Sequence, residues 1–173
     1  DSAMAMTPLP AGKITVCPTG YDDSVWTPGP KEPGLVLTIA GCENEQRMKV
    51  KGIDHLLAAA SKTPGARFVV IGVHPSVAAL LAPSRPPNVE LLPPVDRSEL
   101  LPWYQRASVY CQPSLSEGLP NALCEAMLCG CIPVGTNVGG IPGAIGDQDF
   151  IVPAEDSAAL AAIDAGEAAA EVR

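Results

Sequence analysis

Short runs of apolar, mostly β-branched residues alternate along the chain with stretches of helical periodicity. Residues 34–40 (GLVLTIA) are apolar at nearly every position, which is typical of a strand buried on both faces of a sheet. Residues 51–62 then repeat apolar positions every three or four residues, which predicts a helix. The same reasoning predicts strands over 67–71, 89–92, 108–112, 132–134 and 150–152, and helices beginning at Ser98, spanning 120–129, and following Asp156 or Ser157.

This strand–helix–strand repetition predicts an α/β fold of Rossmann-like type, with an open parallel sheet and helices on both faces. The crossovers between parallel strands should be right-handed. Ligands of such folds bind beyond the carboxyl ends of the strands. The loops that we expect to meet there are 41–52, 72–76, 93–98, 113–121 and 135–146.

The two ends of the chain differ from the middle. We expect residues 1–12 to be a tag remnant or a disordered end, outside the fold. Residues 13–33 hold a short strand, 13–17, and then a passage rich in proline and glycine, so we interpret them as an interdomain connector. Residues 34–173 form the expected ligand-binding domain, and its tail after Asp164 is weakly amphipathic and expected to fray.

Composition narrows the possible partners. The chain has 173 residues, a net charge of −8 and a pI near 4.6, which disfavours nucleic acid or an anionic membrane surface as its main partner. It contains no apolar run of about 18 residues, so no transmembrane segment is expected. The six cysteines show no C-x-x-C pair, so we interpret them as free thiols of a cytoplasmic protein. A zinc site formed by Cys124, Cys129 and Cys131 is the weaker alternative, because no histidine lies nearby.

One segment, Ser114–Gly130, carries the candidate chemistry. Gly118 permits a tight backbone, and Pro120 stands at the start of a predicted helix whose first free amides belong to residues 121–123. Free amides at a helix N-terminus form an anion site that suits phosphate. Glu125 lies one turn into this helix, and Glu117 enters from the loop, so both carboxylates could accept hydrogen bonds from sugar hydroxyls.

Each glutamate also has a simpler interpretation. Glu117 could be a solvated loop residue, and Glu125 could lie on an exposed helix face. The helix around Glu125 is almost entirely apolar, however, and a carboxylate among apolar side chains needs a partner. Together with the framing glycine and proline, this favours a binding site.

The segment resembles the E-G-x-P-x-x-x-x-E-A-M-x-x-G signature of glycosyltransferase family 4, with the two glutamates spaced as Glu117 and Glu125 are. Three further stretches agree, in consistent order along the chain. Residues 13–28 resemble the family's interdomain connector, residues 50–54 its K-G-x-D helix start, and residues 139–142 its G-G-x-P loop.

The resemblance implies the C-terminal domain of a GT-B enzyme, which holds the nucleotide-diphospho-sugar donor (a UDP-, GDP- or ADP-sugar) and needs no other cofactor. It implies that Glu125 binds the ribose, that Glu117 contacts the donor sugar and that Lys51 neutralises the diphosphate, with Glu117 and Lys51 as the catalytic pair. Backbone groups of Gly118, Leu119, Pro120 and Asn121 would face sugar and phosphate. The base would lie against loop 93–98 near Val95. Gly41, at the end of the first strand, would also contact the donor.

The sequence departs from the family at one position. Family members place an arginine directly after the glycine that ends the first strand, whereas Cys42 follows Gly41 here and the loop to Lys51 is longer. Arg47 could fold back to serve instead, or be merely solvated. We expect His55 at the surface of its helix, and His74 could line the cleft.

By the resemblance, the enzyme transfers a hexose with retention and without a metal, to a glycan, lipid or small-molecule acceptor. Its partners would be the donor and a missing N-terminal GT-B domain, through which the enzyme could sit at a membrane surface. The chain alone would then be inactive. The alternative is a non-catalytic sugar-nucleotide-binding module. A dinucleotide-dependent oxidoreductase is disfavoured because the first strand is not followed by G-x-G-x-x-G, and no G-x-S-x-G or P-loop motif indicates a hydrolase or NTPase.

Overall fold

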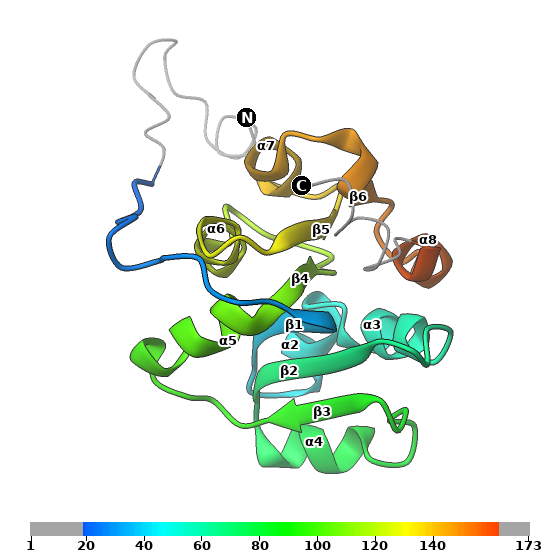
Figure 1. The fold of residues 1–173 in the computed structure, drawn as a ribbon. Coiled ribbons are helices and arrows are strands. Elements are labelled where there is room, and N and C mark those ends of the chain that lie inside the picture. The colour runs from blue at the N-terminus through cyan, green and yellow to red at the C-terminus, as the bar shows by residue number, and fades with distance from the viewer. Residues whose placement is uncertain (1–18, 163–173) are drawn as a thin grey trace, which may run out of the picture.

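The computed structural model describes residues 19–162, which form one six-stranded sheet with helices on both faces (Figure 1). The strand order is β3-β2-β1-β4-β5-β6, and every neighbouring pair is parallel. This confirms the predicted Rossmann-like α/β fold. The strands are β1 (Glu32–Cys42), β2 (Arg67–Val73), β3 (Val89–Leu92), β4 (Ala107–Gln112), β5 (Ile132–Thr136) and β6 (Ile151–Val152).

The alternation of side chains along β1 divides the core in two. Val36 and Ala40 face the layer that includes α2, α3, α4 and α8, whereas Leu35 and Leu37 face the layer of α5, α6 and α7. Both sets are buried, which explains why this strand is apolar at nearly every position. The helices are α2 (Glu45–Val50), α3 (Ile53–Ala60), α4 (Pro75–Leu81), α5 (Leu101–Arg106), α6 (Asn121–Leu128), α7 (Ile141–Ile145) and α8 (Ser157–Ala162), with 3-10 turns at Arg97–Glu99 (η1) and Gln148–Phe150 (η2).

The predicted helices needed more correction than the strands. The helix expected over 51–62 is confirmed as the shorter α3, whereas α2 lies in the passage 41–52 that was expected to be a loop. Gly52, in a left-handed conformation, separates the two helices. The short helices α4 and α7 were not predicted, because each begins at or beside a proline, in a passage that reads as loop. Helix α6 begins at Asn121 and not at Pro120, which is its N-cap. The strand predicted over 13–17 lies outside the described residues.

The strand order places a topological switch between β1 and β4. The chain adds β2 and β3 on one side of β1 and then returns to place β4 on the other side. The connections that leave β1 and β4 therefore diverge at the carboxyl edge of the sheet, which is where folds of this type bind ligands. The connection after β1 carries Lys51, and the connection after β4 carries Glu117.

Several side-chain contacts, among them those of Trp26 and Lys31, attach residues 19–31, which precede β1, to the α5–α6 layer. Trp26 is buried and packs edge-on against Tyr104, with ring centroids 5.5 Å apart. Lys31 Nζ donates to the carbonyl oxygens of Tyr104 at 2.9 Å and Cys129 at 2.8 Å, near the carboxyl ends of α5 and α6. An ammonium group is stabilised at such helix ends by the carbonyls that lack helical partners.

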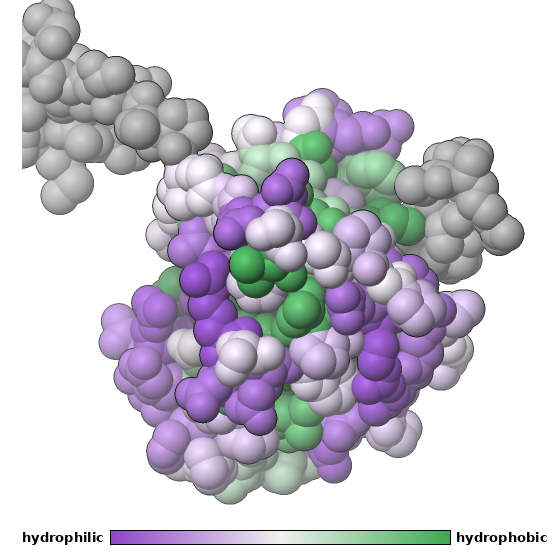
Figure 2. Space-filling model, turned by 60° about the vertical axis from the view of Figure 1, so that its left-hand side comes forward, coloured by the Kyte–Doolittle hydropathy of each residue, from purple (hydrophilic) through white to green (hydrophobic). Residues whose placement is uncertain are grey.

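The surface beside this attachment is mostly hydrophilic. Figure 2, which brings forward the side on which α5 lies in Figure 1, shows polar residues around a smaller hydrophobic area. No helix within residues 19–162 has both the length and the apolar character needed to cross a bilayer.

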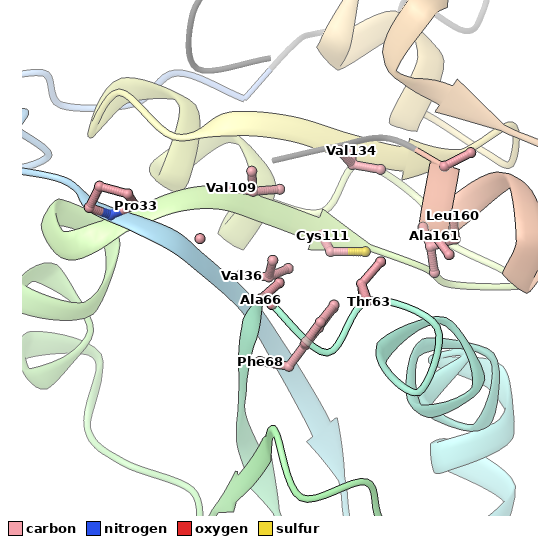
Figure 3. Close-up of a pocket in the computed structure, with 13 residues that line it drawn as sticks. Pro33, Val36, Thr63, Ala66, Phe68, Val109, Cys111, Val134, Leu160 and Ala161 are labelled. Carbon is pink, nitrogen blue, oxygen red and sulfur yellow. The ribbon is translucent and has the colours of Figure 1, made fainter. Parts of the chain in front are cut away.

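A cavity of about 650 Å³ lies away from the carboxyl edge, between the sheet and α8 (Figure 3). Side chains of four strands, Val36, Phe68, Val109 and Val134, form its floor, and Leu160 of α8 closes one side. Its lining is apolar and contains no ionisable side chain other than the thiol of Cys111. It therefore lacks the charged groups that the predicted site requires.

Gly52 sets the position of Lys51, and its replacement provides a test. A Cβ atom at Gly52 would lie 1.9 Å from the carbonyl oxygen of Pro113, and the residue has φ = 65°. We expect Gly52→Ala to lower the free energy of unfolding by about 2 kcal/mol or more, measured by urea denaturation. Gly146→Ala is the matched control, because Gly146 has φ = 76° but no atom near the added Cβ. Gly146→Ala should cost only about 1 kcal/mol for the backbone strain. Equal losses in both variants would contradict the close approach at Pro113.

Candidate functional site

Glu117 lies in the loop after β4 and is fixed by two polar side chains at the end of that strand and by Lys51. Its Oε1 accepts hydrogen bonds from Ser114 Oγ at 2.9 Å and from Gln112 Nε2 at 3.1 Å, and it pairs with Lys51 Nζ. The side chains of Glu117 and Lys51 are only 13% and 16% exposed. The structure thus brings together two of the predicted site residues, as an ion pair at the switch between β1 and β4.

The loop that carries Glu117 is held from both sides. Leu115 N donates to the carbonyl of Val50 at 2.8 Å, which ties the loop to α2. On the other side, Gly140 N donates to the carbonyl of Gly118 at 2.7 Å. Gly139 has φ = 54°, and a Cβ there would lie 1.9 Å from the carbonyl oxygen of Glu117. This close approach explains the two glycines of the predicted G-G-x-P loop in physical terms.

Main-chain amides open toward solvent between the two glutamates. The amides of Gly118, Leu119 and Asn121 donate to no other described residue. The prediction that Leu123 also offers a free amide was wrong, because this amide donates to the carbonyl of Pro120 at 3.2 Å. The N-terminus of α6 therefore retains unpaired donors, together with the positive end of the helix dipole.

Glu125 is buried, with 3% of the residue exposed, and so does not lie on an exposed helix face. Its Oε1 accepts from Arg97 Nη2 at 2.5 Å and from Arg97 Nε at 3.1 Å, and its Oε2 accepts from the hydroxyl of Tyr104 at 3.2 Å. Burial raises the pKa of Tyr104, and the nearby charge of Glu125 raises it further, so this hydroxyl remains a donor at neutral pH. The carboxylate thus has the partners that its burial requires.

Reasoning from sequence missed four residues that hold these glutamates: Arg97, Tyr104, Gln112 and Ser114. Gln112 and Ser114 are polar residues at the end of a buried strand, a signal that could have been recognised. Arg97 and Tyr104 had no comparable signal, because 28 and 21 residues separate them from Glu125.

The remaining predicted residues take less decisive positions. Arg47 lies in α2 and is exposed. The charges of Lys51 and Arg47 lower the pKa of the buried Cys42 thiol, against the larger effect of burial, which raises it. Gly41 is exposed near the end of β1, and Val95 is half-buried against the α5–α6 layer. His74 is exposed and caps α4 by accepting from Ser76 N, while His55 is half-buried.

The described cysteines are Cys42, Cys111, Cys124, Cys129 and Cys131, and all are free. Burial raises the pKa of Cys42 and Cys131 to about 11 and that of Cys111 to about 12, so these groups are neutral thiols at pH 7. Cys17 lies outside the described residues. Within residues 19–162, no cluster of three or more His, Cys, Asp or Glu residues could hold a metal ion.

Solved structures of other proteins have a similar fold. The chain resembles sucrose-phosphate synthase from Thermosynechococcus elongatus, with a TM-score of 0.74 and 20% identity, over 98% of this chain and 50% of that one. It also resembles the C-terminal domain of a glycosyl transferase group 1 family protein from Francisella tularensis, with a TM-score of 0.63 and 20% identity, over 88% and 97% of the two chains. These likenesses support the expected GT-B fold.

Sequence comparison adds the family. The D-inositol 3-phosphate glycosyltransferase of Mycolicibacterium smegmatis is 31% identical over 153 residues, which cover 78% of this chain and 35% of that protein. The enzyme of the same name from Mycobacterium avium is 34% identical over 152 residues. The chain thus spans about a third of the length of these relatives. The sequence profile of the family described as "Glycosyl transferases group 1" matches residues 35–163. The chain therefore belongs to the group 1 glycosyltransferases, a family of transferases, and corresponds to the C-terminal domain of a GT-B enzyme.

Proposed function

We propose that this domain binds the nucleotide-diphospho-sugar donor of a retaining, metal-independent glycosyltransferase. The observation that carries the proposal is the arrangement around the N-terminus of α6. Glu117 and Glu125 lie on either side of unpaired main-chain amides, and Lys51 stands next to Glu117. Carboxylates accept from vicinal hydroxyls, and amides with an ammonium group bind phosphate, so the site offers both kinds of partner that a sugar nucleotide needs.

The chemical role of the site would be to stabilise the departing nucleoside diphosphate. As the bond between the anomeric carbon and the phosphate oxygen breaks, negative charge accumulates on the diphosphate. Lys51 and the first amides of α6 are fixed in place before the reaction, so they would stabilise this charge without reorganisation. Lys51 would exchange its present partner, Glu117, for a phosphate oxygen, and Glu117 would then be free to accept from a sugar hydroxyl.

Retention and independence of metal belong to the same proposal. A lysine and a helix N-terminus supply the positive charge that a bound cation supplies in other transferases. The acceptor would be bound by an N-terminal domain, which this chain does not contain within the described fold. A hexose donor and a glycan, lipid or small-molecule acceptor are the classes that we propose.

The assignment of Glu125 is tested by titrating the protein with UDP-, GDP- and ADP-sugars in a calorimeter. We expect one of the three to bind, and Glu125→Gln to weaken its binding about tenfold or more, because a hydroxyl loses a charged acceptor. Glu45→Gln is the matched control, since Glu45 is exposed and pairs only with Lys49. Absence of heat with all three donors, or equal affinity for wild type and Glu125→Gln, would overturn the donor site.

The role of Lys51 is tested by comparing a nucleoside diphosphate with its nucleoside. Lys51→Met should weaken binding of the diphosphate about tenfold and leave binding of the uncharged nucleoside unchanged. Lys49→Met serves as the control, because Lys49 lies in α2 two residues away but is 60% exposed. EDTA should not alter the affinity of the wild type for the diphosphate. A requirement for Mg²⁺ in this titration would refute metal independence.

Catalysis itself requires the full-length enzyme. We expect it to transfer the sugar with the anomeric configuration of the donor retained, as read by NMR of the product. The present chain alone should bind donor without transferring sugar. Transfer by this chain alone would show that the N-terminal domain is dispensable, whereas a full-length protein that binds donor but transfers nothing would favour a non-catalytic binding module.

A further inference from the structure

We propose that Arg97 competes with the donor for Glu125. By covering the carboxylate in the absence of donor, Arg97 would lower the affinity of the site for the donor. This inference rests on the proposed role of Glu125 as the acceptor for ribose hydroxyls. Arg97 is not part of the E-G-x-P-x-x-x-x-E segment and lies in the turn that precedes α5.

The contacts of Glu125 leave no room for a ligand at one of its oxygens. Two nitrogens of the Arg97 guanidinium donate to Oε1, at 2.5 and 3.1 Å, and the glutamate side chain is only 4% exposed. The other oxygen, Oε2, faces the buried hydroxyl of Tyr104. Because Tyr104 belongs to the core, the only partner of Glu125 that can withdraw is Arg97. A ribose hydroxyl that is to reach Oε1 must displace the guanidinium.

Arg97 is free to make this movement. Its side chain is 70% exposed, although its partner is buried. Its Cζ atom lies 5.2 Å from the centroid of the Trp26 ring, at a distance typical of a cation–π contact. Arg97 and Trp26 also line a cavity of about 630 Å³, together with Tyr21 and Asn121. The guanidinium can therefore leave Oε1 and remain over the indole or enter the cavity.

The charge environment makes the competition moderate. Removal of Arg97 opens the carboxylate to water, since the side chain that covers it is itself exposed. Losing the partner of a buried charge is costly when the charge is left unpaired and away from water. Here water can reach the carboxylate, so this cost is avoided. The ion pair with one exposed member is weak enough for a ligand to break and strong enough to reduce its apparent affinity. We expect a reduction of about three- to tenfold.

The first experiment measures the affinity of the uncharged nucleoside whose diphosphate binds in the donor titration. Arg97→Met keeps an unbranched apolar side chain and removes the guanidinium, with its contacts to Glu125 and Trp26. We expect this variant to bind the nucleoside about three- to tenfold more tightly than the wild type. If Arg97 instead contacts the bound nucleoside directly, Arg97→Met will bind it more weakly, which would overturn the proposal. An unchanged affinity would overturn it as well.

Arg106→Met is the matched control. Arg106 has a similar setting, with Cζ 5.2 Å from the ring of Trp103 and an ion pair to Glu32 at 2.8 Å, but it has no contact with Glu125. Its replacement should leave the affinity for the nucleoside unchanged. A gain equal to that of Arg97→Met would show that the effect comes from the overall charge of the protein.

The second experiment varies ionic strength and compares the wild type with Arg97→Met. An uncharged ligand that displaces an ion pair should bind more tightly as salt weakens that pair. Between about 0.01 and about 1 M NaCl, over which the Debye length falls from about 30 to about 3 Å, the wild type should gain affinity for the nucleoside while Arg97→Met does not. Parallel salt dependences would refute the masking role.

The two proposals fail in different ways. If no donor, diphosphate or nucleoside binds, or if Glu125→Gln changes nothing, the donor site itself is wrong. If binding depends on Glu125 while Arg97→Met weakens it or leaves it unchanged, the donor site stands and only the competition by Arg97 is wrong.

Discussion

The burial of one carboxylate organises much of this domain. Glu125 has 3% exposure in an apolar helix, and a charged group in that position must be hydrogen-bonded. Its partners come from two other elements, Arg97 of η1 and Tyr104 of α5. Tyr104 is itself located by the edge of Trp26 and by Lys31, which donates to its carbonyl. The segment before β1, the turn after β3 and helix α5 are thus all positioned with respect to this carboxylate.

The second carboxylate is satisfied in a different way. Glu117 takes its neutral partners from residues three and five positions away, Ser114 and Gln112. Gln112 is in turn held by the hydroxyl of Tyr110 at 3.1 Å. This local network fixes the orientation of Glu117 before any ligand is bound. Glu125, by contrast, depends on an arginine that is mostly exposed. Under the proposed assignment, a ligand would displace Lys51 from Glu117, which keeps its local network, and the exposed Arg97 from Glu125.

The fold could be predicted because its strands are short runs of mostly β-branched residues. Such runs indicate buried strands from the sequence alone, without knowledge of the residues that pack around them. The helices were harder to predict, since α2 lies in a passage that reads as a loop and two others begin at or beside a proline. The position of the candidate site was predicted from the spacing of Glu117 and Glu125 around a helix start, and this assignment stays a prediction. Its internal contacts did not follow, because Arg97 and Lys31 reach their partners only through the tertiary fold, across 28 and 73 or more residues of sequence. Periodicity and spacing describe single helices and strands, whereas a binding site is formed by residues of several elements.

The net charge of −8 bears on why Lys51 is paired with Glu117. A cation that stood free in an acidic protein would have no fixed location, whereas the contact with Glu117 holds Lys51 at the switch between β1 and β4. Under the proposed assignment, a diphosphate that takes Lys51 leaves Glu117 as a largely buried carboxylate without its counter-ion. A ligand that carries only phosphate would impose this cost, whereas one that carries a sugar as well would return hydroxyl donors to Glu117. The same ion pair that places the lysine would thus make the site favour the complete sugar nucleotide over the nucleotide alone.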